Sequence, residues 1–251
     1  MNVNGMSAQP DPASMQLVAR DVVMAFGGVR ALDGLSFWVP PASAVGLLGQ
    51  NGSGKTTLLN VITGQLMPQS GTVHFEGKMM LGAKPDAYAK AGIARVFQSV
   101  QVFPRLTVLE NLMVAQLGNE EAAPSIEFAK HVLSRMRLED IANDLTRDVS
   151  YGHQRLLEIA MALAARAKLI LFDEPTAGLG ASLAEHVVLC MQELHKAGTS
   201  IVVIEHETSV VFRTCDVIWV LNEGRVIARG TPDEIRVDRQ VLDLYLGAPK
   251  T

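Results

Sequence analysis

Short apolar runs recur along the chain, and each is followed by glycine or polar residues. They occupy residues 44–48, 169–172, 200–204 and 217–221. Near-continuous apolar runs of this kind are typical of strands that are buried on both faces of a mostly parallel sheet. The pattern therefore predicts the α/β fold class.

A helical pattern dominates from about residue 107 to residue 165, between the first two of these runs. Thr107 and Glu110 fit a capping box, and Leu112, Ala115 and Gln116 continue one face of the helix that it begins. Because this stretch contains no strand pattern, we expect a helical subdomain, at about residues 104–165, inserted between strands of the sheet.

The two ends of the chain carry different patterns. Thr231 and Glu234 repeat the capping box, with Pro232 at the first helical position, and predict one helix that runs through Leu244. Residues 1–14 are polar, contain proline and lack the basic and apolar segments of a signal peptide. We expect them to be a disordered lead-in to one domain of residues 15–251.

The composition argues against several classes of protein. Hydrophobic residues make up 48% of the 251 residues and charged residues 19%, as in an ordinary globular protein. With 22 basic and 26 acidic residues the formal charge is −4, so no basic surface for nucleic acid is expected. Cys190 and Cys215 lack C-x-x-C spacing, and we expect buried, reduced thiols. No stretch supplies the roughly 20 apolar residues of a membrane helix.

The first apolar run leads into residues 49–56, which fit the pattern G-x-x-x-x-G-K-[ST]. Its glycines let the backbone aim N–H groups inward as an anion nest, at the positive end of the following helix. Lys55 is expected to reach the β- and γ-phosphates, Thr56 to coordinate Mg²⁺ and Thr57 to contact the α-phosphate. We therefore predict that ATP is bound by Gly49, Gln50, Asn51, Gly52, Ser53, Gly54, Lys55, Thr56 and Thr57.

Charged residues follow two of the other apolar runs, at the strand ends where ligands bind in such sheets. Asp173 is expected to hold Mg²⁺. Because side chains alternate along a strand, Glu174 points away from the side of Asp173 and is expected to act as general base toward the attacking water. His206 could donate a hydrogen bond to the γ-phosphate and hold the water and Glu174 in register. The plainer alternatives are a solvated acidic pair and a structural histidine.

Between the glycine-rich segment at residues 49–56 and the acidic pair at 173–174 lies Ser150-Tyr151-Gly152-His153, followed by an apolar helical run. It resembles the signature motif of ATP-binding-cassette proteins, in the Tyr-Gly form of the branched-chain amino acid and related importers. The resemblance implies that Ser150, Tyr151, Gly152 and His153 meet the γ-phosphate bound by the opposite subunit of a dimer, where the helix dipole adds positive potential. The plainer alternative is an ordinary helix N-cap at Ser150.

Other motifs of that family follow in order, from about Met15 to Gly247. The resemblance implies that Phe26 stacks on adenine, although an isolated Phe is more often a core residue. It also implies that Gln98 touches Mg²⁺ and the attacking water and leads into the segment that contacts a membrane subunit. His153, Gly180 and Glu207 depart from the residues common at their positions.

The resemblance implies a P-loop NTPase fold with a mostly parallel core sheet, an N-terminal antiparallel β subdomain and the inserted helical subdomain. The expected activity is ATP hydrolysis, with ATP and Mg²⁺ as cofactors, in a subunit peripheral to the cytoplasmic face of the inner membrane. Expected partners are a second cassette, identical or paralogous, membrane permease subunits and, indirectly, a solute-binding protein.

Several alternatives remain open for the function. Branched-chain amino acids are the leading solute, and other amino acids, urea or amides come next. An exporter cassette shares several of the motifs. Outside transport, the alternatives are a cassette that acts in DNA repair, translation or regulation, and a nucleotide sensor without hydrolysis.

Overall fold

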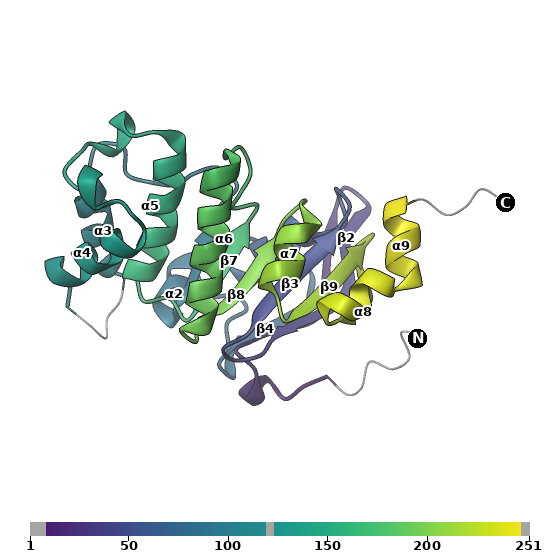
Figure 1. Ribbon diagram of the computed structural model, residues 1–251. Coiled ribbons are helices and arrows are strands. Elements are labelled where there is room, and N and C mark those ends of the chain that lie inside the picture. The colour runs from purple at the N-terminus through teal and green to yellow at the C-terminus, as the bar shows by residue number, and fades with distance from the viewer. Residues whose placement is uncertain (1–8, 119–122, 247–251) are drawn as a thin grey trace.

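The computed structural model describes residues 9–118 and 123–246 of the chain, which form two sheets flanked by helices (Figure 1). In chain order the described elements are η2 (Pro12–Ser14), β1 (Leu17–Phe26), β2 (Val29–Val39), β3 (Ala44–Gly49), α1 (Lys55–Ile62), β4 (Ser70–Phe75), β5 (Lys78–Met79), α2 (Pro85–Ala91), β6 (Ile93–Val96), α3 (Val108–Gln116), α4 (Ile126–Arg135), η3 (Glu139–Ile141), η4 (Thr146–Asp148), α5 (Tyr151–Ala164), β7 (Leu169–Asp173), α6 (Ala181–Lys196), β8 (Ser200–Ile204), α7 (Thr208–Thr214), β9 (Val217–Asn222), β10 (Arg225–Gly230), α8 (Pro232–Val237) and α9 (Arg239–Leu246).

The larger sheet forms the centre of the molecule. Among the described residues its six strands follow the order β10-β9-β3-β8-β7-β6, and only β10 pairs antiparallel with its neighbour. Strands β3, β7 and β8 are buried along their whole length because both faces of the sheet are covered. The four apolar runs of the sequence are β3, β7, β8 and β9, so the predicted α/β sheet is confirmed.

Alternate side chains of the central strands pack into two different cores. On β7, Ile170 and Phe172 join a core with α5, α6 and α7, whereas Leu169 and Leu171 face a second core with α1 and the smaller sheet. This division follows from the pleat, which sends successive side chains to opposite faces. Packing on both faces fixes the residues at the carboxyl ends of β7 and β8.

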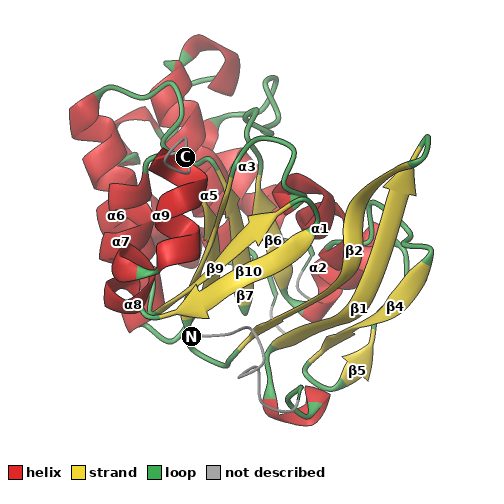
Figure 2. Cartoon of the chain, turned by 90° about the vertical axis from the view of Figure 1, so that its right-hand side faces the viewer, coloured by secondary structure: helices red, strands yellow, loops and turns green. Residues whose placement is uncertain are grey.

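The smaller sheet is antiparallel, with the described order β2-β1-β4-β5 (Figure 2). It is the N-terminal antiparallel β subdomain that the family resemblance implies. Helix α1 contacts both β2 of this sheet and β3 of the larger one. The start of α1 is therefore held where the two sheets come together.

Helices α3 to α5 occupy the stretch where the sequence predicts helices, and they lie together beside the sheet (Figure 1). The capping box that begins α3 is present in both directions. Glu110 N–H donates to Thr107 Oγ1 at 3.2 Å, and Thr107 N–H donates to Glu110 Oε2 at 2.7 Å. These bonds satisfy backbone donors that have no partner inside the helix.

The C-terminal segment forms two helices, so the prediction of one helix through Leu244 is wrong. The capping box of α8 is present, because Thr231 N–H donates to the Glu234 carboxylate at 2.8 Å. Helix α8 ends at Val237, and the ψ of 122° at its C-cap, Asp238, leaves the helical region. The Asp238 carboxylate then accepts the N–H groups of Gln240 and Val241 and caps α9. The apolar spacing runs through this break and does not reveal it.

Three smaller predictions concern the N-terminus, the cysteines and the membrane. Residues 1–8 of the expected lead-in lie outside the described residues, but Pro12–Ser14 form a 3-10 helix, so the expectation of disorder is wrong there. Cys190 and Cys215 are free and buried, as predicted. Within residues 9–118 and 123–246, no helix combines the length and the hydrophobicity needed to cross a bilayer.

An ion pair on α5 holds the segment that follows β6. Arg155 is fully buried, pairs with Glu158 at 2.8 Å and donates to the carbonyl oxygens of Phe97 and Gln98. Glu158 Oε1 accepts the N–H of Phe97 at 3.0 Å. The first turns of α5 and the segment around Gln98 are therefore fixed to each other by charge-assisted hydrogen bonds.

Glu158 gives the stability of the protein a specific pH dependence. Burial raises the pKa of Glu158 to about 7, against the opposing effects of the Phe97 N–H and Arg155. A folded pKa above the unfolded value means that protonated Glu158 favours the folded state. This contribution to the unfolding free energy is complete below about pH 4.5 and is lost as the pH rises through 7. We expect Glu158→Gln to lower the dependence of the unfolding free energy on pH between 5.5 and 8 by roughly 2 kcal/mol.

Urea unfolding at several pH values checks this prediction. Glu127→Gln, which alters an exposed carboxylate on α4, is the matched control and should leave the pH dependence as in the unmodified chain. Parallel stability curves for Glu158→Gln and the unmodified chain would contradict the prediction.

Candidate nucleotide site

The loop between β3 and α1 forms a tight turn that depends on glycine. Gly49, Gly52 and Gly54 have φ angles of 153°, 79° and 106°. A Cβ on Gly49 would lie 2.4 Å from the carbonyl oxygen of Leu221, and one on Gly54 would lie 2.5 Å from that of Ala31. Only glycine fits at these two positions, because both the conformation and the space exclude a side chain.

Lys55 is the first residue of α1, and its side chain lies inside the loop. It is 7% exposed, and its Nζ donates to the carbonyl oxygens of Gly49 at 2.7 Å and Gln50 at 2.9 Å. Burial lowers the pKa of Lys55, whereas the charges of Glu174 and Asp173 raise it. Burial is the larger effect, so the pKa of Lys55 lies below its usual value.

The loop has the donors that a polyphosphate requires. The first helical bond of α1 runs from Leu58 N–H to the Gly54 carbonyl, so the preceding N–H groups of the first turn have no partner within the helix. Ser53 Oγ is buried and has no hydrogen-bond partner among the described residues. Together with Lys55 and the positive end of the helix, these groups fit an anionic ligand.

The remaining residues of the loop differ in their surroundings. Asn51 and Thr56 are exposed, and Thr57 is half-buried. The Gln50 amide donates to the carbonyl oxygen of Leu244 on α9 at 2.7 Å. The Gln50 side chain therefore holds the loop against the C-terminal helix, a contact that the sequence pattern did not predict.

Glu174 brings together the three residues predicted to be catalytic. Its Oε2 accepts the Gln98 amide at 2.9 Å, and its Oε1 lies 2.8 Å from His206 Nε2. Its backbone N–H donates to the Ile204 carbonyl at 2.9 Å, which ties it to the end of β8. The φ of Glu174 is +52°, a conformation that costs free energy in a residue other than glycine. This backbone conformation and the two side-chain contacts hold the carboxylate between Gln98 and His206.

Asp173 lies at the carboxyl end of β7 and forms a buried ion pair that the sequence analysis missed. Its Oδ2 is 2.6 Å from Nη2 of Arg95, and the two side chains are 7% and 6% exposed. Arg95 is on β6, the edge strand beside β7. An arginine in a short strand gives no indication in the sequence of the residue that it will face.

The signature segment begins α5, and its residues contact one another. Ser150 is the N-cap: its hydroxyl accepts the His153 N–H at 3.4 Å and lies 2.9 Å from His153 Nδ1. Tyr151 is 46% exposed, and a Cβ on Gly152 would lie 2.0 Å from a methyl group of Leu183. Within the described chain no hydrogen bond joins Ser150 to residues 49–56, the P-loop between β3 and α1, and Ser150 serves as an N-cap.

Phe26 lies at the tip of the β1–β2 hairpin, where it pairs with Val29 across the turn. Its side chain is 48% exposed. The structure therefore excludes the interpretation of Phe26 as a core residue, and the ring is accessible for stacking.

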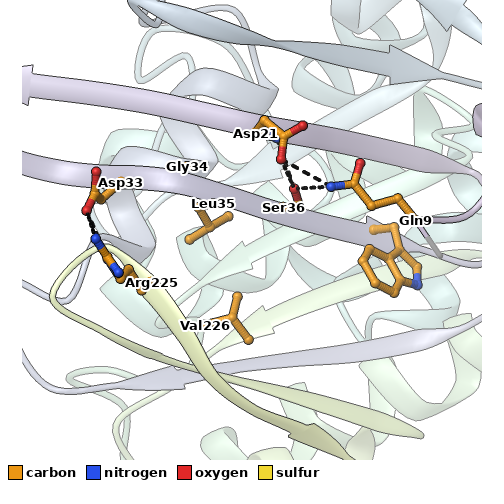
Figure 3. Close-up of a pocket in the computed structure, with 9 residues that line it drawn as sticks. Gln9, Asp21, Asp33, Gly34, Leu35, Ser36, Arg225 and Val226 are labelled. Carbon is orange, nitrogen blue, oxygen red and sulfur yellow. Dashed lines mark hydrogen bonds and ion pairs between the residues drawn. The ribbon is translucent and has the colours of Figure 1, made fainter. Parts of the chain in front are cut away.

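A hollow elsewhere on the surface contains none of the predicted site residues (Figure 3). It is lined by residues of β2 and β10 together with Gln9 and Asp21. Gln9 donates to Asp21 and Ser36, each at 3.1 Å, and Arg225 pairs with Asp33. These polar groups bind one another, so the hollow offers no set of free groups directed at a ligand.

Comparison with known proteins gives a consistent result. The profile of the ABC transporter family matches residues 32–177, and that of the branched-chain amino acid ATP-binding cassette transporter family matches residues 225–251. The high-affinity branched-chain amino acid transport ATP-binding protein BraF of Pseudomonas aeruginosa is 33% identical, over 90% of this chain and 95% of its own. The probable branched-chain amino acid transport ATP-binding protein LivG of Archaeoglobus fulgidus is 34% identical, over 89% of this chain and 92% of its own.

Solved structures agree with the relatives. An ATP-binding cassette of an ABC transporter in its ADP conformation has a TM-score of 0.82 and 32% identity, over 93% of this chain and 99% of its own. A dimeric post-hydrolysis cassette bound to ADP and Pi has a TM-score of 0.77 and 28% identity, over 86% and 98%. The fold, the geometry of the loop before α1 and these similarities show that the chain belongs to the ABC transporter family, as one of its ATP-binding cassettes.

Proposed function

We propose that this chain is the ATP-hydrolysing subunit of an ABC importer, with branched-chain amino acids as the solute. The observation that carries the proposal of hydrolysis is the position of Glu174, which is held between Gln98 and His206. The solute is proposed from the names of the relatives and from the family profile at the C-terminus.

In this proposal the P-loop binds the nucleotide with Lys55, the N–H groups at the start of α1 and the Ser53 hydroxyl. Lys55 exchanges its bonds to the Gly49 and Gln50 carbonyls for bonds to phosphate oxygens. The side chains proposed to hold Mg²⁺ are Thr56, Gln98 and Asp173. Bound there, Mg²⁺ supplies positive charge that neutralises the transferring phosphoryl group.

Glu174 is the proposed general base. Its carboxylate is fixed on both sides, by the amide of Gln98 and by the ring of His206. A carboxylate in fixed orientation can accept a proton from a water placed beside the γ-phosphate. His206 is 53% exposed, so part of its ring remains free to meet a phosphate. Phe26 is proposed to stack on the adenine.

A second cassette, identical or paralogous, completes the proposed site. Ser150, Tyr151, Gly152 and His153 are proposed to contact the γ-phosphate held by the opposite subunit, which matches the absence of bonds from Ser150 to the P-loop within the described chain. The dimeric cassette with ADP and Pi supports this arrangement. Loss of the γ-phosphate would then remove contacts from both subunits and favour opening.

The membrane-spanning part of the proposed importer consists of separate permease subunits. The segment after Gln98 is the proposed contact, and Phe103 within it is 46% exposed. The chain would then be peripheral to the cytoplasmic face of the inner membrane, and a solute-binding protein would deliver the solute to the permease.

The first prediction concerns Glu174→Gln. Because it removes the proposed base and keeps the size of the side chain, we expect phosphate release to fall by about 10²–10⁴ while ATP binding persists. Single-turnover phosphate release and titration with labelled ATP measure the two quantities. Glu193→Gln, at an exposed carboxylate on α6, is the control. Turnover of Glu174→Gln equal to that of the control would refute the assignment.

The second prediction concerns Lys55→Ala. Loss of a charged hydrogen-bond donor to the phosphates should weaken ATP binding by about 10–100-fold. Titration with a fluorescent ATP analogue measures the change, and Lys196→Ala at the exposed end of α6 should bind as the unmodified chain does. Equal affinities of the two variants would remove Lys55 from the site.

The third prediction concerns the solute. Cells that lack this chain should lose uptake of labelled leucine, isoleucine and valine, and the unmodified gene should restore it while the Glu174→Gln gene should not. Restored uptake of urea or of an amide instead would favour the second solute class. If neither solute class depended on the chain, the importer proposal would fail.

A further inference from the structure

Arg95, on the short edge strand β6, bonds to three side chains beside the site. Its Nη2 pairs with Asp173 Oδ2 at 2.6 Å, and its Nη1 donates to Asn60 Oδ1 at 2.6 Å and to Gln65 Oε1 at 3.3 Å. The guanidinium carbon also lies 4.7 Å from the centroid of the Phe97 ring. One side chain thus joins β7, helix α1 with the turn that follows it, and the segment before Gln98.

The charges around Asp173 show what this arrangement does. Asp173 and Glu174 are adjacent carboxylates at the end of β7, and only 5% of Asp173 is exposed. Two adjacent negative charges in a buried place cost free energy unless nearby cations offset their repulsion. Lys55 provides one positive charge from the P-loop, and Arg95 provides the second from β6.

We propose that Arg95 is the counter-ion that holds Asp173 in position until a metal–nucleotide complex binds, and that it weakens the attraction of the site for the metal. It is a positioning residue, because it acts on the nucleotide only through Asp173. It engages one carboxylate oxygen, Oδ2, and leaves Oδ1 for another ligand. The part that concerns the metal rests on the proposed role of Asp173 as a Mg²⁺ ligand.

The sign of the effect on the metal follows from Coulomb's law. A guanidinium beside the carboxylate repels a divalent cation, and removal of that charge makes the local potential more negative. Removal also frees the Asp173 side chain to turn, which weakens binding, but the charge term is the larger because it acts on a doubly charged ion in a buried site. A variant that lacks Arg95 should therefore bind Mg²⁺ more tightly, and in the absence of Mg²⁺ it should be less stable than the unmodified chain.

Thermal unfolding of the full chain without nucleotide or divalent cation tests the pairing. Arg95→Met leaves Asp173 without its partner, so the melting temperature should fall by about 6–20 °C. Arg95→Lys, which keeps the charge, should recover part of that loss. In Arg95→Met combined with Asp173→Asn the loss should be smaller than the sum of the two single losses. Additive losses would overturn the proposal. Arg213→Met is the control, since its pair with Glu185 is half exposed.

The metal is tested with ADP and increasing Mg²⁺, followed as the rise in melting temperature. The Mg²⁺ concentration at half of the rise should be lower for Arg95→Met than for the unmodified chain and for Arg213→Met. An equal or higher concentration would overturn the proposed effect on the metal. If Arg95 and Asp173 are coupled but Asp173→Asn keeps the full response to Mg²⁺, the role of Asp173 in the proposed function fails instead.

Discussion

Charge balance at the carboxyl edge of the larger sheet is the constraint on which the site depends. Burial would make each charge at this edge costly alone, but the strands place acids and bases beside one another. Asp173 has Arg95 as partner, and the fields of both carboxylates reach Lys55. A nucleotide with its metal would enter a set of charged groups that the fold has already brought together.

The fold keeps this arrangement rigid by packing the sheet on both faces. Alternate residues of β7 enter separate cores, so the strand cannot slide or rotate without emptying both. The strain at Glu174 is sustained by that packing and by its bond to Ile204. Through Arg155, the signature helix α5 is fixed to the backbone around Gln98, and hence to the carboxylate of Glu174. A displacement of α5 would therefore reach the proposed base through Arg155 and Gln98.

Much of this could be predicted from local sequence, and the failures have a common cause. The four apolar strands β3, β7, β8 and β9, the two capping boxes and the glycine-rich loop before α1 are encoded by neighbouring residues, and the structure has these elements where the sequence predicts them. The bond of Arg95 to Asp173 and that of Arg155 to the Gln98 carbonyl were missed because these partners lie 78 and 57 residues away, and spacing contains no information on such contacts. The break at Asp238 was missed because the apolar pattern continues across it. Asp238 itself, a good N-cap residue, was the available indication.

The central claim is that ATP is enclosed by the P-loop of one subunit and the signature segment of another. Phosphate release from a mixture of Lys55→Ala and Ser150→Phe chains tests it most directly. In a dimer of two copies of this chain, each variant alone should be inactive, but the mixed dimer has one site in which both halves are intact, and activity should return on mixing. A mixture as inactive as its components would contradict a site shared between two copies of this chain, and full activity of Ser150→Phe by itself would contradict a site shared between any two subunits.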